Sequence, residues 1–229
     1  MIHIFDVDGT LTPSRDRMKD DFAKFFEHFA THNSCYLVTG SDREKTLEQI
    51  PESIYNLFIR CYQCSGNHVF EQHREVHRDE WKLPDDSNTF LLVELHESGW
   101  KPRTGQHFDN RPGLCNFSVV GRGCSLEQRH LYKQWDEHKE ERIGIATRFN
   151  KKFGKTIRAT VAGETGIDIT PVGKGKSQIL RDFDINEPIS FYGDKTIQGG
   201  NDYDLAAALN FKNVHQVEDW RHTWKILLN

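Results

Sequence analysis

The sequence predicts an α/β protein whose doubly wound, mostly parallel (Rossmann-like) sheet is interrupted by an inserted α+β cap domain. At both ends of the chain, short apolar runs typical of buried strands alternate with segments of helical spacing. In the middle, helices and strands no longer alternate one for one. We therefore expect a core made of residues 1–79 and 173–229 and a cap made of residues 80–172.

The first part of the core contains two strand and helix pairs. Ile2–Val7 is apolar except for His3, as expected for a strand that is buried on both faces of a parallel sheet. A helix from Met18 onward is indicated by phenylalanines at helical spacing, and Cys35–Val38 and Asp42–Ile50 predict the next strand and a capped helix. The phenylalanines are Phe22, Phe25, Phe26 and Phe29.

The middle of the chain is expected to form an α+β insert. It contains a predicted helix over Ser87–Glu97, a strand over Cys115–Val120, a long charged helix from Ser125 to about Phe153, and strands near Ile157–Ala162 and Ile167–Thr170.

The alternation of strand and helix returns after Lys174. A helix should run from there to about Phe183, followed by a strand over Ile189–Tyr192, a loop, a strand around Val214–Val217 and a closing helix over Trp220–Leu228. In such a sheet the functional site is expected at the carboxyl ends of the strands.

Composition limits the possible partners. The chain has 229 residues, a net charge of −4 and 36% hydrophobic residues, which is enough to bury a core. The acidic balance argues against nucleic acid or an anionic membrane as a partner. No apolar stretch approaches the roughly 20 residues of a membrane helix, and the apolar N-terminal run ends too early, at Asp6, for a signal peptide. We expect a cytoplasmic protein that binds a small ligand.

Five cysteines, an odd number, favour reduced thiols over a disulfide framework. Cys61 and Cys64 form a CxxC pair that is followed by His68, His73 and His77, so a zinc site is one interpretation. The other interpretation is two ordinary thiols near a strand end, followed by a polar turn, because no second CxxC exists.

Paired carboxylates follow the first predicted strand. Asp6 and Asp8 lie two residues apart and should face one crevice, where a cation or a shared proton would offset their repulsion. Gly9 allows the backbone to turn its amides toward an anion. A bare DxD could instead be a turn that caps a helix, whereas the full DxDGTLT after an apolar strand favours a catalytic site.

Further candidate groups follow at later strand ends. Thr39 and Ser41 can offer hydroxyls and amides to a phosphoryl oxygen, although the same residues could simply cap a helix. Lys176, which begins the helix predicted after the cap, can neutralise a phosphoryl group, although a single lysine at such a place is usually on the solvated surface. Asp194 and Asp202, in a glycine-bearing loop, supply the further carboxylates that a hard cation such as Mg²⁺ requires.

The DxDGTLT motif resembles the signature of the haloacid dehalogenase superfamily. The resemblance implies that Asp6 is a nucleophile that forms an aspartyl-phosphate, and that Asp8 is the general acid and base. It also implies a Mg²⁺ site formed by Asp6, Asp194 and the backbone carbonyl of Asp8, with Asp202 orienting a metal-bound water.

Within this superfamily, three segments resemble the eukaryotic-type phosphomannomutases in particular: Phe5–Arg15, Gly193–Asp202 and Asn110–Arg129. This family resemblance implies isomerisation of mannose 1-phosphate and mannose 6-phosphate through a hexose bisphosphate, and a homodimer formed through the cap. It also implies arginines that grip the distal phosphate, and an aspartate that binds sugar hydroxyls. The matching residues are Arg15, Arg111, Arg122, Arg129 and Asp168.

Two alternative functions fit the same residues. A sugar phosphatase on the same fold differs only in passing the phosphoryl group to water. Thr39, where the family often has glycine, and Gly166, where it usually has serine, are departures in that direction. The more distant alternative is a sugar-phosphate-binding protein without catalytic activity.

Overall fold

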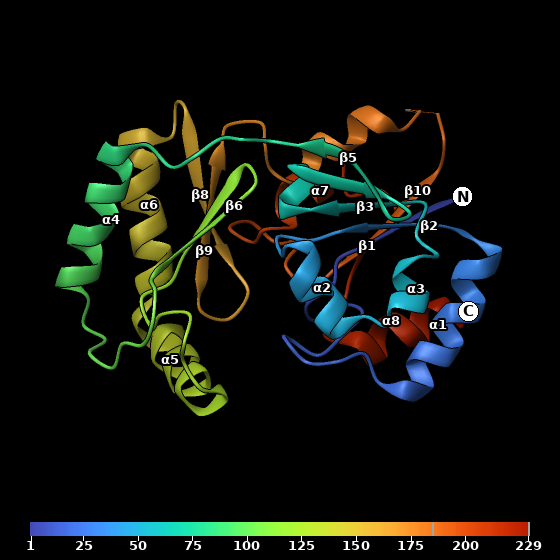
Figure 1. The fold of residues 1–229 in the computed structure, drawn as a ribbon, viewed down its shortest axis with the longest axis horizontal. Coiled ribbons are helices and arrows are strands. Elements are labelled where there is room, and N and C mark those ends of the chain that lie inside the picture. The colour runs from blue at the N-terminus through green and yellow to red at the C-terminus, as the bar shows by residue number, and fades with distance from the viewer. Residues whose placement is uncertain (185, 229) are drawn as a thin grey trace. The chain divides into compact units, whose positions relative to one another are not determined.

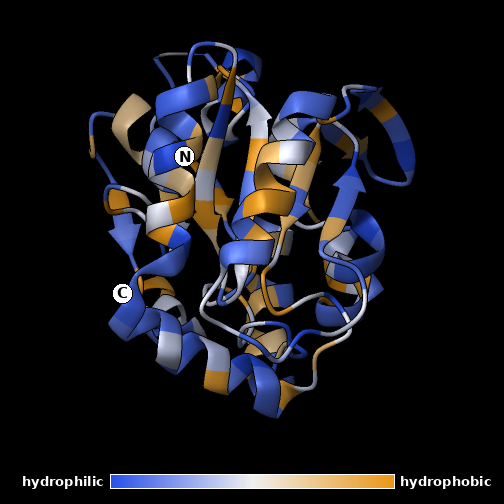
Figure 2. Ribbon diagram, turned by 90° about the vertical axis from the view of Figure 1, so that its left-hand side faces the viewer, coloured by the Kyte–Doolittle hydropathy of each residue, from blue (hydrophilic) through white to orange (hydrophobic). Residues whose placement is uncertain are grey.

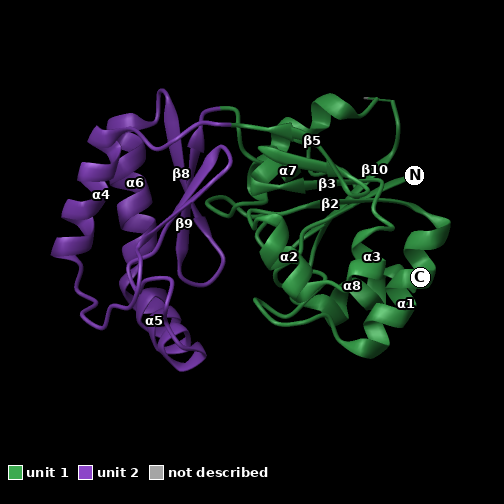
Figure 3. Ribbon diagram, in the orientation of Figure 1, with its two compact units in different colours: residues 1–79, 173–229 green, residues 80–172 purple. Residues whose placement is uncertain are grey.

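The computed structural model describes residues 1–184 and 186–228, and the chain divides into two compact units. Unit 1 comprises residues 1–79 and 173–229, and unit 2 comprises residues 80–172 (Figure 3). Each unit has its own sheet and its own buried apolar cluster. The second segment of unit 1 therefore returns to a sheet that the first segment begins.

Unit 1 contains a seven-stranded sheet in the order β11-β10-β1-β2-β3-β4-β5. The first five strands in this order are parallel, and β4 and β5 continue the sheet as antiparallel strands. The mostly parallel α/β class is confirmed. The strands are β1 (Ile2–Phe5), β2 (Ser34–Val38), β3 (Arg60–Gln63), β4 (His68–Glu71), β5 (Arg74–Arg78), β10 (Ile189–Gly193) and β11 (Val214–Gln216).

An aromatic cluster joins helix α1 to this sheet. Phe22 and Phe26 of α1 are fully buried, and the Phe26 ring meets the ring of Phe5 in β1 edge-on at a centroid distance of 5.1 Å. Phe22 packs on Trp220 and Trp224 of α8. The helices of unit 1 are α1 (Asp20–His32), α2 (Arg43–Gln49), α3 (Glu52–Tyr55), α7 (Tyr203–Ala208) and α8 (Trp220–Leu227), with short 3-10 turns η1 (Cys64–Gly66) and η2 (Lys176–Asp182) (Figure 1).

Unit 2 contains a four-stranded antiparallel sheet in the order β6-β7-β9-β8. Apolar side chains such as Phe117 and Ile169 form its core together with Phe149 from helix α6. The elements are α4 (Asp85–Glu97), β6 (Phe108–Arg111), β7 (Leu114–Phe117), α5 (Leu126–Lys139), α6 (Glu141–Phe153), β8 (Ile157–Ala162) and β9 (Gly166–Pro171).

The long helix predicted from Ser125 to about Phe153 is wrong in one respect. The chain forms two helices, α5 and α6, because Glu140 adopts a left-handed conformation with φ of 52°. Ser125 caps α5 through a complete capping box with Gln128, and Asp136 accepts hydrogen bonds from the backbone and the side chain of Arg142 just beyond the break. The charged residues around Glu140 give no sign of this break between the two helices.

Other differences from the predicted elements are local. Strand β6, the β4–β5 hairpin and helix α7 were not expected, and the segment after Lys174 is a 3-10 turn instead of a helix. The ribbon coloured by hydropathy shows orange and blue stretches following one another along the helices, the pattern of helices buried on one face (Figure 2). Within the described part of the chain, none of the helices has the length and apolar character needed to cross a membrane.

Candidate active site

Three carboxylates meet at the carboxyl ends of neighbouring parallel strands in unit 1. Asp6 follows β1, Asp194 follows β10, and Asp202 immediately precedes α7. Each contributes an oxygen to a group in which all the oxygens lie within 4.8 Å of one another. The parallel pairing of β1 with β10 brings these residues together, since it aligns Phe5 with Tyr192 and so places the following residues at one sheet edge.

A buried lysine joins two of these carboxylates. The Nζ of Lys176 donates hydrogen bonds to Oδ1 of Asp6 and to Oδ1 of Asp202, both at 2.6 Å, and its side chain is fully buried. Burial lowers the pKa of Lys176, but the charges of Asp202 and Asp6 outweigh it and raise the pKa above its usual value. Lys176 is therefore a permanent ammonium group inside the acidic site.

The negative charge of the three carboxylates is nevertheless larger than the positive charge around them. Burial raises the pKa of Asp6, against the effect of Lys176, and it raises the pKa of Asp194 to about 6 with a further contribution from Asp202. The ammonium of Lys195 lies 3.4 Å from Asp194, but its side chain is half exposed. Three clustered carboxylate oxygens that lack full charge compensation fit a hard divalent cation that prefers oxygen ligands.

Asp8 lies beside this cluster and is held by other contacts. Its Oδ1 accepts a hydrogen bond from the backbone N–H of Arg15 at 2.7 Å and another from Nε2 of Gln49 at 3.0 Å. Gln49, at the end of α2, is buried and also donates to Oγ1 of Thr12. Gln49 could not be predicted from the sequence, because a glutamine 41 positions away from Asp8 carries no local signal of this contact.

Two glycines allow the acidic groups to approach the backbone closely. Gly9 has φ of +76°, and a Cβ atom there would lie 2.8 Å from Oδ2 of Asp194. A Cβ at Gly193 would lie 2.8 Å from Oδ2 of Asp202. Both positions therefore require glycine if the carboxylates are to keep their places.

Thr39 and Ser41 form a compact turn after β2. Oγ1 of the buried Thr39 accepts a hydrogen bond from the backbone N–H of Ser41 at 3.1 Å, and the carbonyl of Thr39 accepts one from Ser65. The turn thus follows the strand next to β1, at the same sheet edge as Asp6.

Unit 2 holds a second polar group, built around Asp109. Oδ2 of Asp109 accepts hydrogen bonds from Nε and Nη2 of Arg111 at 3.0 and 2.6 Å, and Nη2 of Arg122 also donates to this oxygen. Burial lowers the pKa of Arg122, and so does the neighbouring charge of Arg111. Two guanidinium groups therefore converge on one carboxylate oxygen, an arrangement that is also suited to a phosphate.

Asp168 belongs to the same polar group. Its Oδ1 accepts a hydrogen bond from Nδ2 of Asn116 at 2.6 Å, and Oδ1 of Asn116 accepts one from Arg122 at 3.0 Å. Arg129 is also buried, and its nearest acidic partner is Glu164 at 3.7 Å. The structure thus links Arg111, Arg122 and Asp168 through intervening side chains, whereas Arg129 pairs with Glu164.

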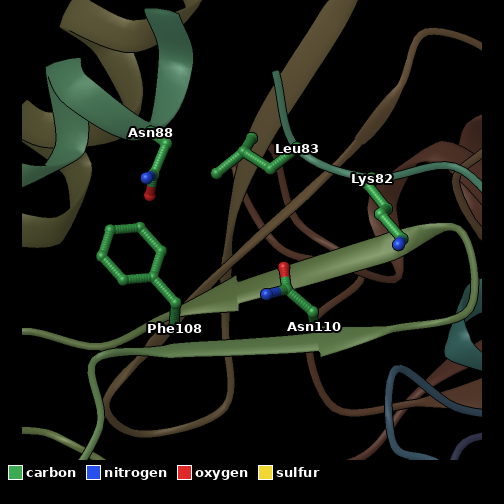
Figure 4. A pocket seen from close by; sticks show the side chains of 5 residues that line it. All are labelled: Lys82, Leu83, Asn88, Phe108 and Asn110. Carbon is green, nitrogen blue, oxygen red and sulfur yellow. The ribbon is translucent and has the colours of Figure 1, made fainter. Parts of the chain in front are cut away.

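Asp109 and Asn116 were not among the site residues predicted from the sequence. The turn at Pro112 and Gly113, where Gly113 has φ of 62°, could have revealed the β6–β7 hairpin that pairs these two residues. On the opposite side of β6, Phe108 and Asn110 line a hollow of about 370 Å³ together with Lys82, Leu83 and Asn88 (Figure 4). Because side chains alternate along a strand, this hollow is separate from the group around Asp109.

The CxxC pair has no part in a comparable cluster. Cys61 and Cys64 are buried thiols that form no disulfide, and burial raises the pKa of Cys61 to about 12. Of the residues that the structure describes, only Asp6, Asp194 and Asp202 form a group of three side chains that could share an ion.

Comparison with solved structures identifies the class of fold. The chain superimposes on the N-terminally truncated IMP-nucleotidase of Plasmodium falciparum with a TM-score of 0.66 and 13% identity, covering 99% of this chain and 69% of that one. A haloacid dehalogenase-like hydrolase from Bacteroides thetaiotaomicron gives a TM-score of 0.59 and 11% identity, covering 99% and 98%. The chain therefore shares the fold of this haloacid dehalogenase-like hydrolase, with an acidic cluster at the carboxyl ends of its parallel strands.

Sequence comparison identifies the family within this class. The family model for eukaryotic phosphomannomutase matches residues 22–229. The phosphomannomutase of Spinacia oleracea is 30% identical over 216 residues, which cover 91% of this chain and 87% of that protein. The chain belongs to the eukaryotic phosphomannomutase family, as the motifs predicted.

Replacing Lys176 with methionine should strongly destabilise the metal-free protein, because two buried carboxylates would lose their shared ammonium partner. The expected loss in free energy of unfolding is about 3–5 kcal/mol, measured by urea denaturation in EDTA and followed by circular dichroism. Lys195→Met is the matched control, since its half-exposed ion pair should contribute at most about 1 kcal/mol. Equal losses in the two variants would contradict this account of Lys176.

Proposed function

We propose that the protein interconverts mannose 1-phosphate and mannose 6-phosphate by way of a hexose bisphosphate. Membership of the phosphomannomutase family supports this assignment. The structural observation that carries it is the convergence of Arg111 and Arg122 on one oxygen of Asp109. A mutase must hold the phosphate that is not reacting, and a pair of guanidinium groups already oriented around an anion is suited to that task.

In the proposed mechanism, the Asp6 carboxylate attacks phosphorus and displaces the sugar oxygen, which takes a proton from Asp8. An aspartyl-phosphate formed in this way from a hexose bisphosphate then passes its phosphoryl group to the free O6 hydroxyl of mannose 1-phosphate, while Asp8 removes the proton of that hydroxyl. Attack of Asp6 on the O1 phosphate of the resulting bisphosphate releases mannose 6-phosphate and restores the aspartyl-phosphate. Hydrogen bonds from Gln49 and from the backbone of Arg15 hold Asp8 in place for both proton transfers.

Asp6, Asp194 and Asp202 would hold or surround a Mg²⁺ ion, with the backbone carbonyl of Asp8 as a further ligand. When bound, the ion would offset charge between the nucleophile and the phosphoryl group. Lys176 keeps Asp6 oriented by a hydrogen bond. Thr39 and Ser41 would offer their hydroxyls to the phosphoryl oxygens, because the backbone N–H groups of both residues already donate, to the carbonyl of Tyr62 and to Oγ1 of Thr39.

Unit 2, which comprises residues 80–172, would act as the cap of the enzyme. Arg111 and Arg122 would grip the distal phosphate, Asp168 would accept hydrogen bonds from sugar hydroxyls, and Arg129 and Arg15 would add positive charge. We further propose a homodimer formed through unit 2, as the family resemblance implies, and a cytoplasmic enzyme without nucleic-acid or membrane partners.

Asp6→Asn should abolish phosphoryl transfer while the protein remains folded, because the amide is a poor nucleophile. Asp8→Asn should lower turnover by about 10²–10⁴-fold, the usual contribution of general acid and base catalysis. Steady-state rates with mannose 1-phosphate and a hexose bisphosphate measure both effects. Substantial turnover by the Asp6→Asn variant would remove the covalent mechanism.

Chelation should stop the reaction reversibly and leave the fold intact, because the ion would bind at a sheet edge and not in an apolar core. We expect EDTA to eliminate turnover, added Mg²⁺ to restore it, and the circular dichroism spectrum to stay unchanged throughout. Activity that survives exhaustive chelation would show that the acidic cluster has another role.

Arg122→Ala separates a mutase from a phosphatase. Loss of a charge-assisted contact, about 1.5–3 kcal/mol, should lower mutase activity roughly ten- to two-hundred-fold. Hydrolysis of a small aryl phosphate should fall much less, because that ester has no distal phosphate. Arg158→Ala, an exposed arginine on β8 of the same unit, is the control.

The products that the wild-type protein forms from mannose 1-phosphate also distinguish a mutase from a phosphatase. If it hydrolyses mannose 1-phosphate and forms no 6-phosphate in the presence of bisphosphate, the sugar phosphatase becomes the correct assignment. Equal losses of both activities in the Arg122→Ala variant would show that this arginine has a structural role only.

A further inference from the structure

The polar group of unit 2 forms a row across three strands. Backbone pairing places Asp109 of β6 opposite Asn116 of β7, and Asn116 opposite Asp168 of β9. Side chains at paired positions point to the same face of a sheet, so these residues are direct neighbours on one face. Asn116, which is 5% exposed, is the middle member of the row.

The amide of Asn116 joins two residues of opposite charge. Its Oδ1 accepts from Nη1 of Arg122 at 3.0 Å, and its Nδ2 donates to Oδ1 of Asp168 at 2.6 Å. An arginine can only donate and a carboxylate can only accept, so the two partners fix the orientation of the amide. Any rotation of Asn116 would break both hydrogen bonds together.

A glycine provides the space for this amide. A Cβ atom at Gly166 would lie 2.6 Å from Nδ2 and 3.1 Å from Oδ1 of Asn116, with the carbonyl oxygen of Ala162 next at 3.3 Å. Gly166 is not among the glycines with positive φ, so the backbone itself would accept alanine. The requirement for glycine here comes from the neighbouring amide.

We propose that Asn116, in the space left by Gly166, is a positioning residue that couples the phosphate-gripping Arg122 to the hydroxyl-binding Asp168. The inference rests on the proposed function of these two residues. It adds that the phosphate and the sugar ring are recognised as one unit, since one amide sets the positions of both groups. Gly166 thereby becomes a determinant of substrate binding, although it has no side chain.

A set of variants tests the hydrogen bonds separately from packing. Asn116→Ala removes the amide, whereas Asn116→Asp keeps its size but removes the donor and places a carboxylate against Asp168. We expect both to raise KM for mannose 1-phosphate by about ten- to hundred-fold with a much smaller change in kcat, because the interaction is remote from the reacting phosphoryl group. A packing role predicts that the Asn116→Asp variant behaves like the wild type, and this result would overturn the proposal.

A double-mutant cycle tests the role of Gly166. Gly166→Ala alone should raise KM as Asn116→Ala does, since its methyl group displaces the amide. In the Asn116→Ala background there is no amide to displace, so Gly166→Ala should add less than about a two-fold effect. Additive effects would show that Gly166 acts through Ala162 or the strand, and would overturn the coupling.

The same double-mutant cycle can be measured without relying on activity. Calorimetry gives the affinity of each variant for mannose 1-phosphate in EDTA, where no turnover is expected. Wild-type protein that binds the sugar phosphate but does not isomerise it would overturn the proposed function, while the binding cycle would still decide the role of Asn116. Wild-type protein that fails to bind it would overturn both.

Discussion

Lys176 donates from one fully buried nitrogen to Asp6 and Asp202, which reach it from β1 and from the loop before α7. Since a buried charge is costly without partners, the positions of these three side chains are interdependent. Other features of unit 1 follow from the same constraint. Gly193 must be small because Asp202 lies against it, and Asp202 in turn accepts a hydrogen bond from the backbone of Lys195.

Unit 2 largely buries the positive charge of two arginine side chains. It keeps Arg111 and Arg122 buried or nearly buried by pairing both with one carboxylate, so that their positive charge is held in defined positions. Asp109 thus acts as an internal counterion for the guanidinium pair. Such preorganisation reduces the entropy lost on binding, because the long arginine side chains are already ordered.

The sequence predicted the fold class and the acidic site because their signals are local. Apolar runs of strand length precede Asp6 and Asp194, and the motif around each is contiguous. The corner at Glu140 was missed because its charged neighbours on both sides favour helix equally well. Strand β6 was missed because the polar residues Asp109 and Asn110 give no apolar pattern, although they lie on a sheet.

The contacts of Gln49 and Asn116 could not have been predicted from local patterns. Each joins residues that are far apart in the chain, and only the folded sheets bring them together. The same holds for Gly166, whose role depends on the Asn116 amide in a different strand. Motifs therefore identified the charged groups, while the neutral side chains that orient them emerged only from the three-dimensional arrangement.

The discontinuous sheet of unit 1 also bears on how the chain is made. Strand β1 lies between β2 and β10, so one side of β1 has no partner until residues 189–193 leave the ribosome. Unit 2, whose residues 80–172 are continuous, can complete its own sheet earlier. During synthesis the nascent protein therefore carries an open strand edge on β1, directly before Asp6, and this stage is the one most exposed to mispairing with other chains.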